Sequence, residues 1–194
     1  MNNIKIIPQM LSGSVKIPPS KSIAHRAIIA AALSKGECTI DNAAMSMDIE
    51  ATLGGIRALG SKYTYSKKDA RLNISAKKSI GRNIEIDCGE SGSTLRFLIP
   101  IALLTGKKIK FTGHGRLIQR PMEPYFKMFA RHGISCLTEG DCMYLDGKLT
   151  GGAYEIEGNV SSQFITGLLF ALPLAEEDSE IIITTTAESK GYID

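Results

Sequence analysis

Three segments of this chain resemble one another and recur about every 70 residues. They read VKIPPSKSIAHRAIIAAALSKGECTIDN from Val15, IEIDCGESGSTLRFLIPIALLTGKKIKFTG from Ile84 and YEIEGNVSSQFITGLLFALPLAEEDSEIIITT from Tyr154. Each segment predicts a strand, a turn rich in Gly and Ser, an apolar helix, a short turn and a second strand. The period is longer than that of a typical solenoid repeat. We therefore expect three related units that share one core.

A second helix and two more strands follow in the first two units. SMDIEATLGGIRALG places Ile49, Leu53 and Ile56 on one helical face, with Ser46 as the N-cap, and RPMEPYFKMFARHG has a similar pattern. Strand-like runs come next: SKYTYS and ARLNIS, then GISCLTE and CMYLDG. The unit is therefore βαβαββ. The predicted repeats cover about residues 15–83, 84–153 and 154–194, and the third is cut short before its second helix, so we infer a piece of a longer protein.

The first helix of each unit is apolar on nearly every side, whereas the second helices are amphipathic. A helix that is apolar all round is buried, and an amphipathic one lies at a surface. The sequence thus predicts an α/β (α+β) domain with three buried parallel helices, surrounded by sheets and amphipathic helices. The N-termini of the three buried helices would gather at one end of the domain.

Polar side chains stand where each buried helix begins. Unpaired backbone N–H groups and the helix dipole favour anions there, and guanidinium groups bind carboxylates and phosphates in a bidentate manner. His25 lies inside the first cluster, either as a ligand contact or as a support for one. The clusters predict a site for a ligand with several phosphate or carboxylate groups. Their members are Lys21, Ser22, Arg26, Glu90, Ser91, Gly92, Ser93, Arg96, Ser161, Ser162 and Gln163.

Composition narrows the class of protein. The net charge is +3 and aromatic residues make up 6% of the chain, which argues against a nucleic-acid-binding protein. The four cysteines form no CxxC pair and only three histidines are present, so we expect no zinc site. No signal peptide is evident, and the apolar runs are too short to span a membrane. We expect a cytoplasmic protein and a monomer, with no membrane partner.

Four motifs, PPSKSIAHRAIIAAAL, CGESGSTLRF, GRLIQRPMEP and GNVSSQFITGLL, together resemble the N-terminal half of 5-enolpyruvylshikimate-3-phosphate synthases. The resemblance extends from about Val15 to Asp194. It implies one domain of the two-domain enolpyruvyl transferase fold, with three βαβαββ units per domain and the active site between the domains. It also implies that residues 1–14 belong to the other domain and that residues 15–194 form a substrate-binding domain.

The resemblance implies an enzyme that transfers the enolpyruvyl group of phosphoenolpyruvate to the 5-hydroxyl of shikimate 3-phosphate and releases phosphate. It also implies that the reaction needs no metal and no other cofactor. Such enzymes act in the shikimate pathway toward chorismate and aromatic amino acids, and the herbicide glyphosate inhibits them. The family's catalytic Asp and Glu and further Lys and Arg ligands lie in the C-terminal half. We therefore expect this chain alone to be inactive, to retain some affinity for shikimate 3-phosphate, and to have the missing half as its partner.

The family's roles transfer to matching positions of this chain. The catalytic candidate is Lys21, which contacts phosphoenolpyruvate and assists proton transfer. Supporting residues are Ser93 and Arg96. The implied phosphoenolpyruvate ligands are Lys21, Gly92, Arg120 and Gln163, and a side chain at Gly92 would obstruct glyphosate. The implied shikimate 3-phosphate ligands are Lys21, Ser22, Arg26 (on the carboxylate), Ser161, Ser162 (on the phosphate), Gln163, Ser189 and Tyr192.

Three positions depart from the family pattern. Glu90 stands where many members have Asn and would bring negative charge to an anion site, so we do not expect it to bind phosphoenolpyruvate directly. Phe97 and Gly191 each stand where many members have Pro.

Two alternatives to this function remain. One is a UDP-N-acetylglucosamine enolpyruvyl transferase, whose first motif has Lys-Asn where this chain has Lys21-Ser22. The other is a non-enzymatic domain that binds anions or nucleic acid, for which a salt-dependent affinity for DNA or RNA would be the sign.

Overall fold

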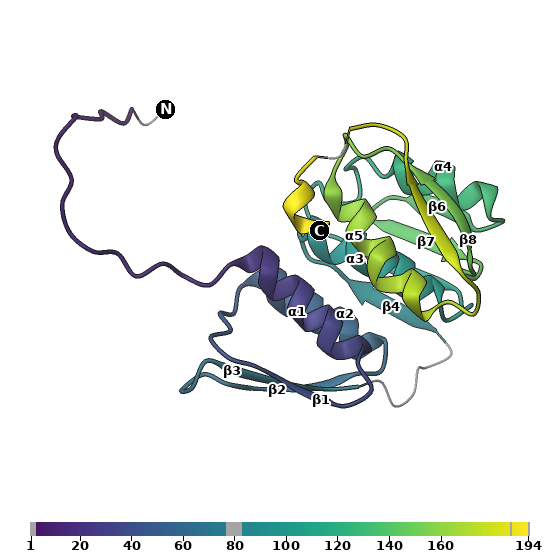
Figure 1. The fold of residues 1–194 in the computed structure, drawn as a ribbon, viewed down its shortest axis with the longest axis horizontal. Coiled ribbons are helices and arrows are strands. Elements are labelled where there is room, and N and C mark those ends of the chain that lie inside the picture. The colour runs from purple at the N-terminus through teal and green to yellow at the C-terminus, as the bar shows by residue number, and fades with distance from the viewer. Residues whose placement is uncertain (1–2, 77–82, 187, 194) are drawn as a thin grey trace.

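The computed structural model describes residues 3–76, 83–186 and 188–193, drawn in Figure 1. The α-helices of these residues are α1 Lys21–Leu33, α2 Met47–Ala58, α3 Gly92–Leu103, α4 Glu123–Arg131 and α5 Ser162–Ala171. Two short 3-10 helices follow α5, η1 Leu172–Leu174 and η2 Lys190–Tyr192. The strands are β1 Glu37–Ile40, β2 Lys62–Ser66, β3 Arg71–Ser75, β4 Ile84–Asp87, β5 Ile109–Thr112, β6 Ser135–Glu139, β7 Cys142–Asp146, β8 Gly152–Ile156 and β9 Ser179–Ile183.

The strands form three sheets in the described residues, one for each unit. The second unit is complete and runs β4, α3, β5, α4, β6, β7, with its sheet in the order β4-β5-β7-β6. Strands β4 and β5 are parallel, and β5, β7 and β6 are antiparallel to their neighbours along the rest of the sheet. The third unit begins in the same way, with β8 and β9 parallel around α5. The βαβαββ order predicted from the repeats is confirmed in the second unit.

Serine caps start four of the five α-helices in the described residues. The side chains of Ser20, Ser46, Ser91 and Ser161 accept hydrogen bonds from backbone N–H groups in the first turns of α1, α2, α3 and α5. The predicted cap at Ser46 is thus confirmed, and Ile49, Leu53 and Ile56 of α2 are buried as its spacing indicated. Each cap satisfies one of the several orphan donors at its helix start. The other N–H groups at the starts of α1, α3 and α5 point toward the end of the domain where the predicted site lies.

The predicted first strand of the first unit is absent, and this prediction was wrong. Residues 3–19 carry no strand and run away from the body as an extended arm, on which Val15 and Ile17 are 86% and 83% exposed (Figure 1). The corresponding strands β4 and β8 each lie against the second helix of the preceding unit, α2 and α4 respectively. No described helix occupies that place for Val15, so the apolar side of such a strand would remain in water.

The first helices of the three units each bury much of their surface, as predicted, but to different extents. All residues of α3 from Phe97 to Leu103 are buried, but Ile23 of α1 is 62% exposed and Leu169 of α5 is 41% exposed. The reason is packing: α3 contacts α1, α2 and α5, whereas α1 packs mainly on α2 and its own sheet. The middle helix therefore has neighbours on more of its sides than the other two.

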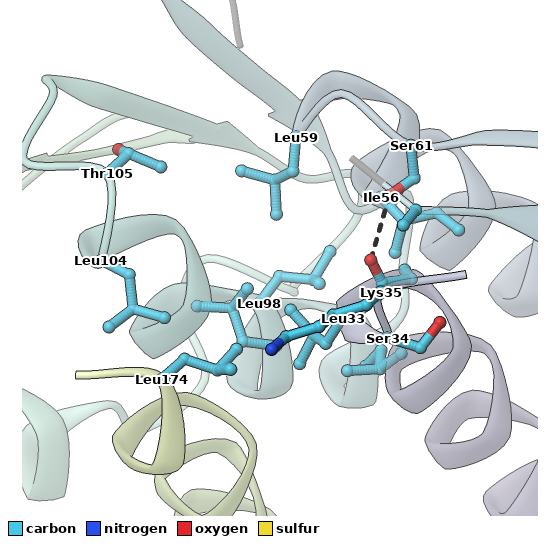
Figure 2. A pocket seen from close by; sticks show the side chains of 14 residues that line it. Leu33, Ser34, Lys35, Ile56, Leu59, Ser61, Leu98, Leu104, Thr105 and Leu174 are labelled. Atoms are coloured by element: carbon cyan, nitrogen blue, oxygen red, sulfur yellow. Dashed lines mark hydrogen bonds between the residues drawn. The ribbon is translucent and has the colours of Figure 1, made fainter. Parts of the chain in front are cut away.

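A cavity of about 490 Å³ separates the first unit from the others where the helices end. Figure 2 shows its apolar walls, which include Leu33 of α1, Ile56 of α2, Leu98 of α3 and Leu174 of η1, with the Lys35 side chain reaching between Leu98 and Leu174. The cavity lies at the C-terminal ends of α1, α2 and α3, opposite the helix starts that carry the predicted site. No helix among the described residues is both long and apolar enough to cross a bilayer.

Candidate functional site

The N-terminal turns of α1, α3 and α5 are joined by polar side chains. Arg26 of α1 donates from Nη2 to Thr166 Oγ1 of α5 over 3.3 Å, and Gln163 of α5 donates from Nε2 to Ser93 Oγ of α3 over 2.8 Å. These contacts join residues 140 and 70 positions apart in the chain. The three predicted clusters therefore meet in one site.

Arg26 is held from several directions by groups that carry no negative charge. Its Nη1 donates to the Ser22 carbonyl over 3.0 Å, and its guanidinium lies between the rings of Phe97 and Tyr192, at 5.0 and 4.3 Å from their centroids. Its Nε is buried and has no partner in the described part of the chain. Burial lowers the pKa of Arg26, and Tyr192 acts in the opposite direction. A partly desolvated cation of this kind is stabilised when an anion binds beside it.

Arg96 is a second guanidinium held by neutral groups. Its Nη1 donates to Gln163 Oε1 over 2.9 Å, its guanidinium lies 4.9 Å from the Phe164 ring centroid, and its Nε is buried without a partner among the residues described. Burial lowers the pKa of Arg96 first, and the nearby Arg120 lowers it further. Behind it, the Tyr125 hydroxyl donates toward the Arg96 and Phe164 carbonyls at 2.9 and 2.8 Å. This arrangement fixes the first turns of α3 and α5 against each other.

Gly92 is the first residue of α3 and lies beneath the guanidinium groups of Arg96 and Arg120. A Cβ atom placed on it would lie 2.8 Å from Arg120 Nη1 and 3.5 Å from Arg96 Nη1. The two guanidinium groups therefore converge over backbone that only a glycine leaves uncovered. Within residues 3–76, 83–186 and 188–193, neither Arg26, Arg96 nor Arg120 forms an ion pair. The site thus carries positive charge that no acidic side chain of these residues neutralises.

Lys21, the predicted catalytic residue, has a partner that sequence reasoning missed. Its ammonium forms an ion pair with Asp48 in the first turn of α2. The Lys21 side chain is 58% exposed, so its other N–H groups face solvent. The neighbouring Ser22 is half-buried, and its carbonyl is the acceptor for Arg26.

His25 is a buried support, because its ring has no access to a ligand. It is 1% exposed, and its Nδ1 lies 2.7 Å from Thr52 Oγ1 of α2. Burial lowers its pKa to about 4. The positive charges of Lys21 and Arg26 add to this effect, while Asp48 opposes it. The imidazole is therefore neutral near pH 7.

The remaining predicted residues lie around α5 and at the chain's end. Ser161 caps α5 and accepts from the Gln163 N–H over 3.3 Å, and Ser162 beside it is buried. Ser189 precedes η2 with a left-handed φ of 52°, and Tyr192 in η2 stacks on Arg26. η2 contacts α5, so both residues border the site.

The three departures from the family pattern have separate structural settings. The Glu90 carboxylate faces the Gly115 loop, with Oε1 3.1 Å from where a Cβ on Gly115 would lie, and it forms no ion pair among the described residues. Phe97 is fully buried and supports Arg26. Gly191 lies within η2 with open space where a side chain would be.

In the described residues, no three side chains of His, Cys, Asp or Glu are grouped so that they would hold a metal ion. The same residues include four free cysteines, and burial raises the pKa of the Cys136 thiol to about 11. A thiol of that kind is a poor nucleophile near pH 7.

Asp48, Thr52 and Thr166 were not predicted as part of the site. Asp48 was visible in the sequence only as an acidic residue in a first helical turn, which usually indicates a dipole interaction. No local signal reveals that it pairs with a lysine 27 positions away, because the pairing depends on how α1 and α2 pack.

A sequence model of the family described as EPSP synthase (3-phosphoshikimate 1-carboxyvinyltransferase) matches residues 6–194. A 3-phosphoshikimate 1-carboxyvinyltransferase of Clostridium novyi (strain NT) is 49% identical over 204 aligned positions, which cover 100% of this chain and 47% of that protein. The enzyme of the same name from Clostridium perfringens (strain SM101 / Type A) is 50% identical over 196 positions, covering 100% and 46%. The chain therefore spans about half the length of these relatives.

The fold of this chain is also similar to that of a solved EPSP synthase. The solved EPSP synthase of Acinetobacter baumannii superimposes with a TM-score of 0.75 at 23% identity, covering 93% of this chain and 42% of that one. At this identity the similarity shows the fold alone. Since the family model covers nearly the whole sequence and relatives are about half identical throughout, the chain belongs to the EPSP synthase family.

Proposed function

We propose that this chain supplies most of the shikimate 3-phosphate site and part of the phosphoenolpyruvate site of an enzyme that transfers an enolpyruvyl group to the 5-hydroxyl of shikimate 3-phosphate, with release of phosphate. The observation that carries this proposal is a set of arginines without a carboxylate partner among the described residues: Arg96 and Arg120 converge over Gly92 at the start of α3, and Arg26 of α1 bonds to α5. Two substrates that each carry a phosphate and a carboxylate match this charge.

Shikimate 3-phosphate is assigned to the α1 and α5 side of the site. Arg26 with Ser22 would bind its carboxylate, and Ser161 and Ser162 would bind its phosphate at the α5 N-terminus, where unpaired N–H groups favour an anion. Gln163, already fixed by Arg96 and Ser93, would pack against the ring. Ser189 and Tyr192 complete this assignment from η2.

Phosphoenolpyruvate is assigned to the α3 side. Arg120 and the Gly92 backbone would bind it, next to Gln163. Lys21 would contact both phosphoenolpyruvate and shikimate 3-phosphate and would assist proton transfer. Asp48 orients the Lys21 ammonium through their ion pair. The 5-hydroxyl oxygen bonds to C2 of phosphoenolpyruvate while the methylene carbon gains a proton; phosphate then leaves and that carbon loses a proton, which restores the double bond. A cationic donor beside the reacting oxygens lowers the barrier to these steps.

The relatives are about twice as long as this chain, and the remaining half would supply the groups that complete catalysis. General acid–base groups must lie within hydrogen-bond reach of the reacting atoms. We therefore expect no turnover by the 194-residue protein.

Residues 3–14 are exposed throughout, which fits their assignment to a neighbouring domain, with residues 15–194 as the substrate-binding domain. The four free thiols fit a reducing cytoplasm.

Calorimetric titration of shikimate 3-phosphate into the 194-residue protein tests the proposal, with shikimate as the ligand control. We expect binding that requires the phosphate. Replacing Ser161 and Ser162 together by alanine should weaken it at least about 30-fold, because two hydrogen bonds to a charged group are lost.

Ser34→Ala is the matched control for a lost serine. Its hydroxyl donates to the Ala31 carbonyl over 2.8 Å at the opposite end of α1, so affinity should be unchanged. Equal affinity for shikimate and shikimate 3-phosphate would contradict the proposal. So would salt-dependent binding of RNA or DNA in place of either ligand.

Gly92→Ala should weaken phosphoenolpyruvate binding roughly tenfold while leaving the melting temperature within a few degrees. The new Cβ, 2.8 Å from Arg120 Nη1, displaces an exposed and flexible side chain and not the core. Titration of phosphoenolpyruvate at saturating shikimate 3-phosphate measures the change. In an Arg120→Ala background, Gly92→Ala should have little further effect, and fully additive losses would refute the displacement.

A further inference from the structure

A chain of buried hydrogen bonds crosses three helices beneath the site. His25 Nδ1 lies 2.7 Å from Thr52 Oγ1, Thr52 Oγ1 lies 2.6 Å from Thr94 Oγ1, and Thr94 donates to Ser91 Oγ over 2.7 Å. All four residues are at most 3% exposed. They come from α1, α2 and α3, and none has a role in the substrate assignment above. We call this set the hydroxyl chain.

The hydroxyl chain is attached to the residue that pairs with Lys21. The hydroxyls of Thr52 and Thr94 both lie within reach of the Asp48 carbonyl, at 3.2 and 3.3 Å. Asp48 thus has its backbone held from α2 and α3, and its carboxylate holds the Lys21 ammonium. Lys21 and His25 are four residues apart on α1 and therefore lie on one face of that helix. The Lys21–Asp48 ion pair and the His25–Thr52 contact, one helical turn apart, join this face to α2.

A purely structural role would not need these polar groups. Valine has nearly the shape of threonine and would fill the same space without a buried hydroxyl. Buried polar groups are costly unless they have partners, and a connected network fixes one geometry among several that apolar packing would allow. The four side chains are connected, with His25 joined through Nδ1, while His25 Nε2 is buried without a partner among the described residues. The hydroxyls of Thr52 and Thr94 each have more than two polar atoms within hydrogen-bond distance, and these links lie at helix starts that face the site.

We propose that His25, Thr52 and Thr94 are positioning residues that set the Lys21 ammonium relative to the N-terminus of α3, acting through Asp48. The inference rests on the proposed function for the role of Lys21 toward substrate, but the positioning itself does not. Loss of the Thr52 or the Thr94 hydroxyl removes one of the two side-chain groups that reach the Asp48 carbonyl. The Lys21–Asp48 pair then loosens although neither residue has changed.

The test compares Thr52→Val, which removes the hydroxyl, with Thr52→Ser, which keeps it. The readout is the rate at which acetic anhydride acetylates each lysine of the folded 194-residue protein, followed by mass spectrometry of peptides. Lys21 should react roughly threefold faster in the valine variant, because an ion pair that protects its ammonium is weakened. It should react at the wild-type rate in the serine variant. Lys148, paired with Glu176 on the far side, is the internal reference.

Two results would overturn the proposal. One is an unchanged Lys21 rate in a folded Thr52→Val protein, and the other is an equal increase in the valine and serine variants. Thr94→Val and Thr94→Ser form a second pair with the same expectation if Thr52→Val does not fold, since Thr94 also reaches Asp48.

Shikimate 3-phosphate titration of the same variants separates this inference from the proposed function. Thr52→Val should weaken binding about tenfold and Thr52→Ser less than about twofold. If Lys21 labelling responds as expected and wild-type protein binds no shikimate 3-phosphate, the positioning role stands and the proposed function fails. If binding is present and labelling does not respond, the proposed function stands and the positioning role fails.

Discussion

Gly167→Ala is expected to lower the free energy of unfolding by about 4 kcal/mol. This figure adds the cost of an extra atom in a packed core to the cost of leaving buried carbonyl groups without a hydrogen-bond donor. Gly167 lies where α5 crosses α3. A Cβ there would be 2.2 Å from Tyr125 Oη and 2.6 Å from the Arg96 carbonyl oxygen. The Tyr125 hydroxyl would be pushed from its two carbonyl acceptors, and α3 and α5 would have to separate. Urea denaturation followed by circular dichroism measures the loss.

Gly54→Ala is the matched control for this substitution. Gly54 also lies inside a helix, α2, but a Cβ placed on it would meet no heavy atom of the described residues within 4 Å. Alanine there should stabilise the protein by about 0.5–1 kcal/mol through helix propensity. A Gly167→Ala protein as stable as wild type would show that α3 and α5 move apart without cost, and the close helix contact would not be a determinant of stability.

Acidification from pH 7 to pH 4 is expected to remove on the order of 3 kcal/mol of stability through His25 alone. Its pKa falls from 6.5 to about 4 in the folded protein, chiefly because the ring is buried. Between these values the unfolded chain binds a proton at His25 and the folded chain does not, so stability rises with pH across this window. The contribution is fully present above pH 6.5 and is lost as the pH falls toward 4.

His25→Asn isolates this effect from other acidic transitions. The amide keeps a polar group near the Nδ1 position but does not titrate. Unfolding free energies of both proteins, measured at half-unit steps from pH 7.5 to 4, should converge as the pH falls. Parallel curves would mean that the imidazole is protonated in the folded state, and that the buried ring is charged.

The sequence predicted those features that depend on short stretches of chain. Periodicity indicated the buried face of α2, Ser46 indicated its cap, and recurrence of the unit indicated the order of strands and helices. The strand predicted at Val15–Ile17 does not form, because a strand is stable only when it pairs with another strand and is covered by a helix. Neither condition can be recognised from three residues.

The candidate site likewise contains residues that short stretches of sequence predict and contacts that they do not predict. Arg26, Arg96 and the serines were found because each stands at a helix start within its own segment. The pairing of Lys21 with Asp48 and of Arg26 with Thr166 was missed, because these contacts depend on the angle and spacing of packed helices. The distinction between a buried His25 and a ligand-binding one was also left open, since burial of a single ring depends on its neighbours in three helices.

The outer edge of β1 has a consequence for the protein in concentrated solution. Among the strands of the described residues β1 pairs only with β3, so the backbone N–H and C=O groups of its other side have no strand partner there. Free edges of this kind accept any extended segment, and residues 3–19 are such a segment. Two molecules that exchange these arms would each complete the other's sheet. We therefore expect the arm of one molecule to add to the β1 edge of another, to an extent that increases with protein concentration.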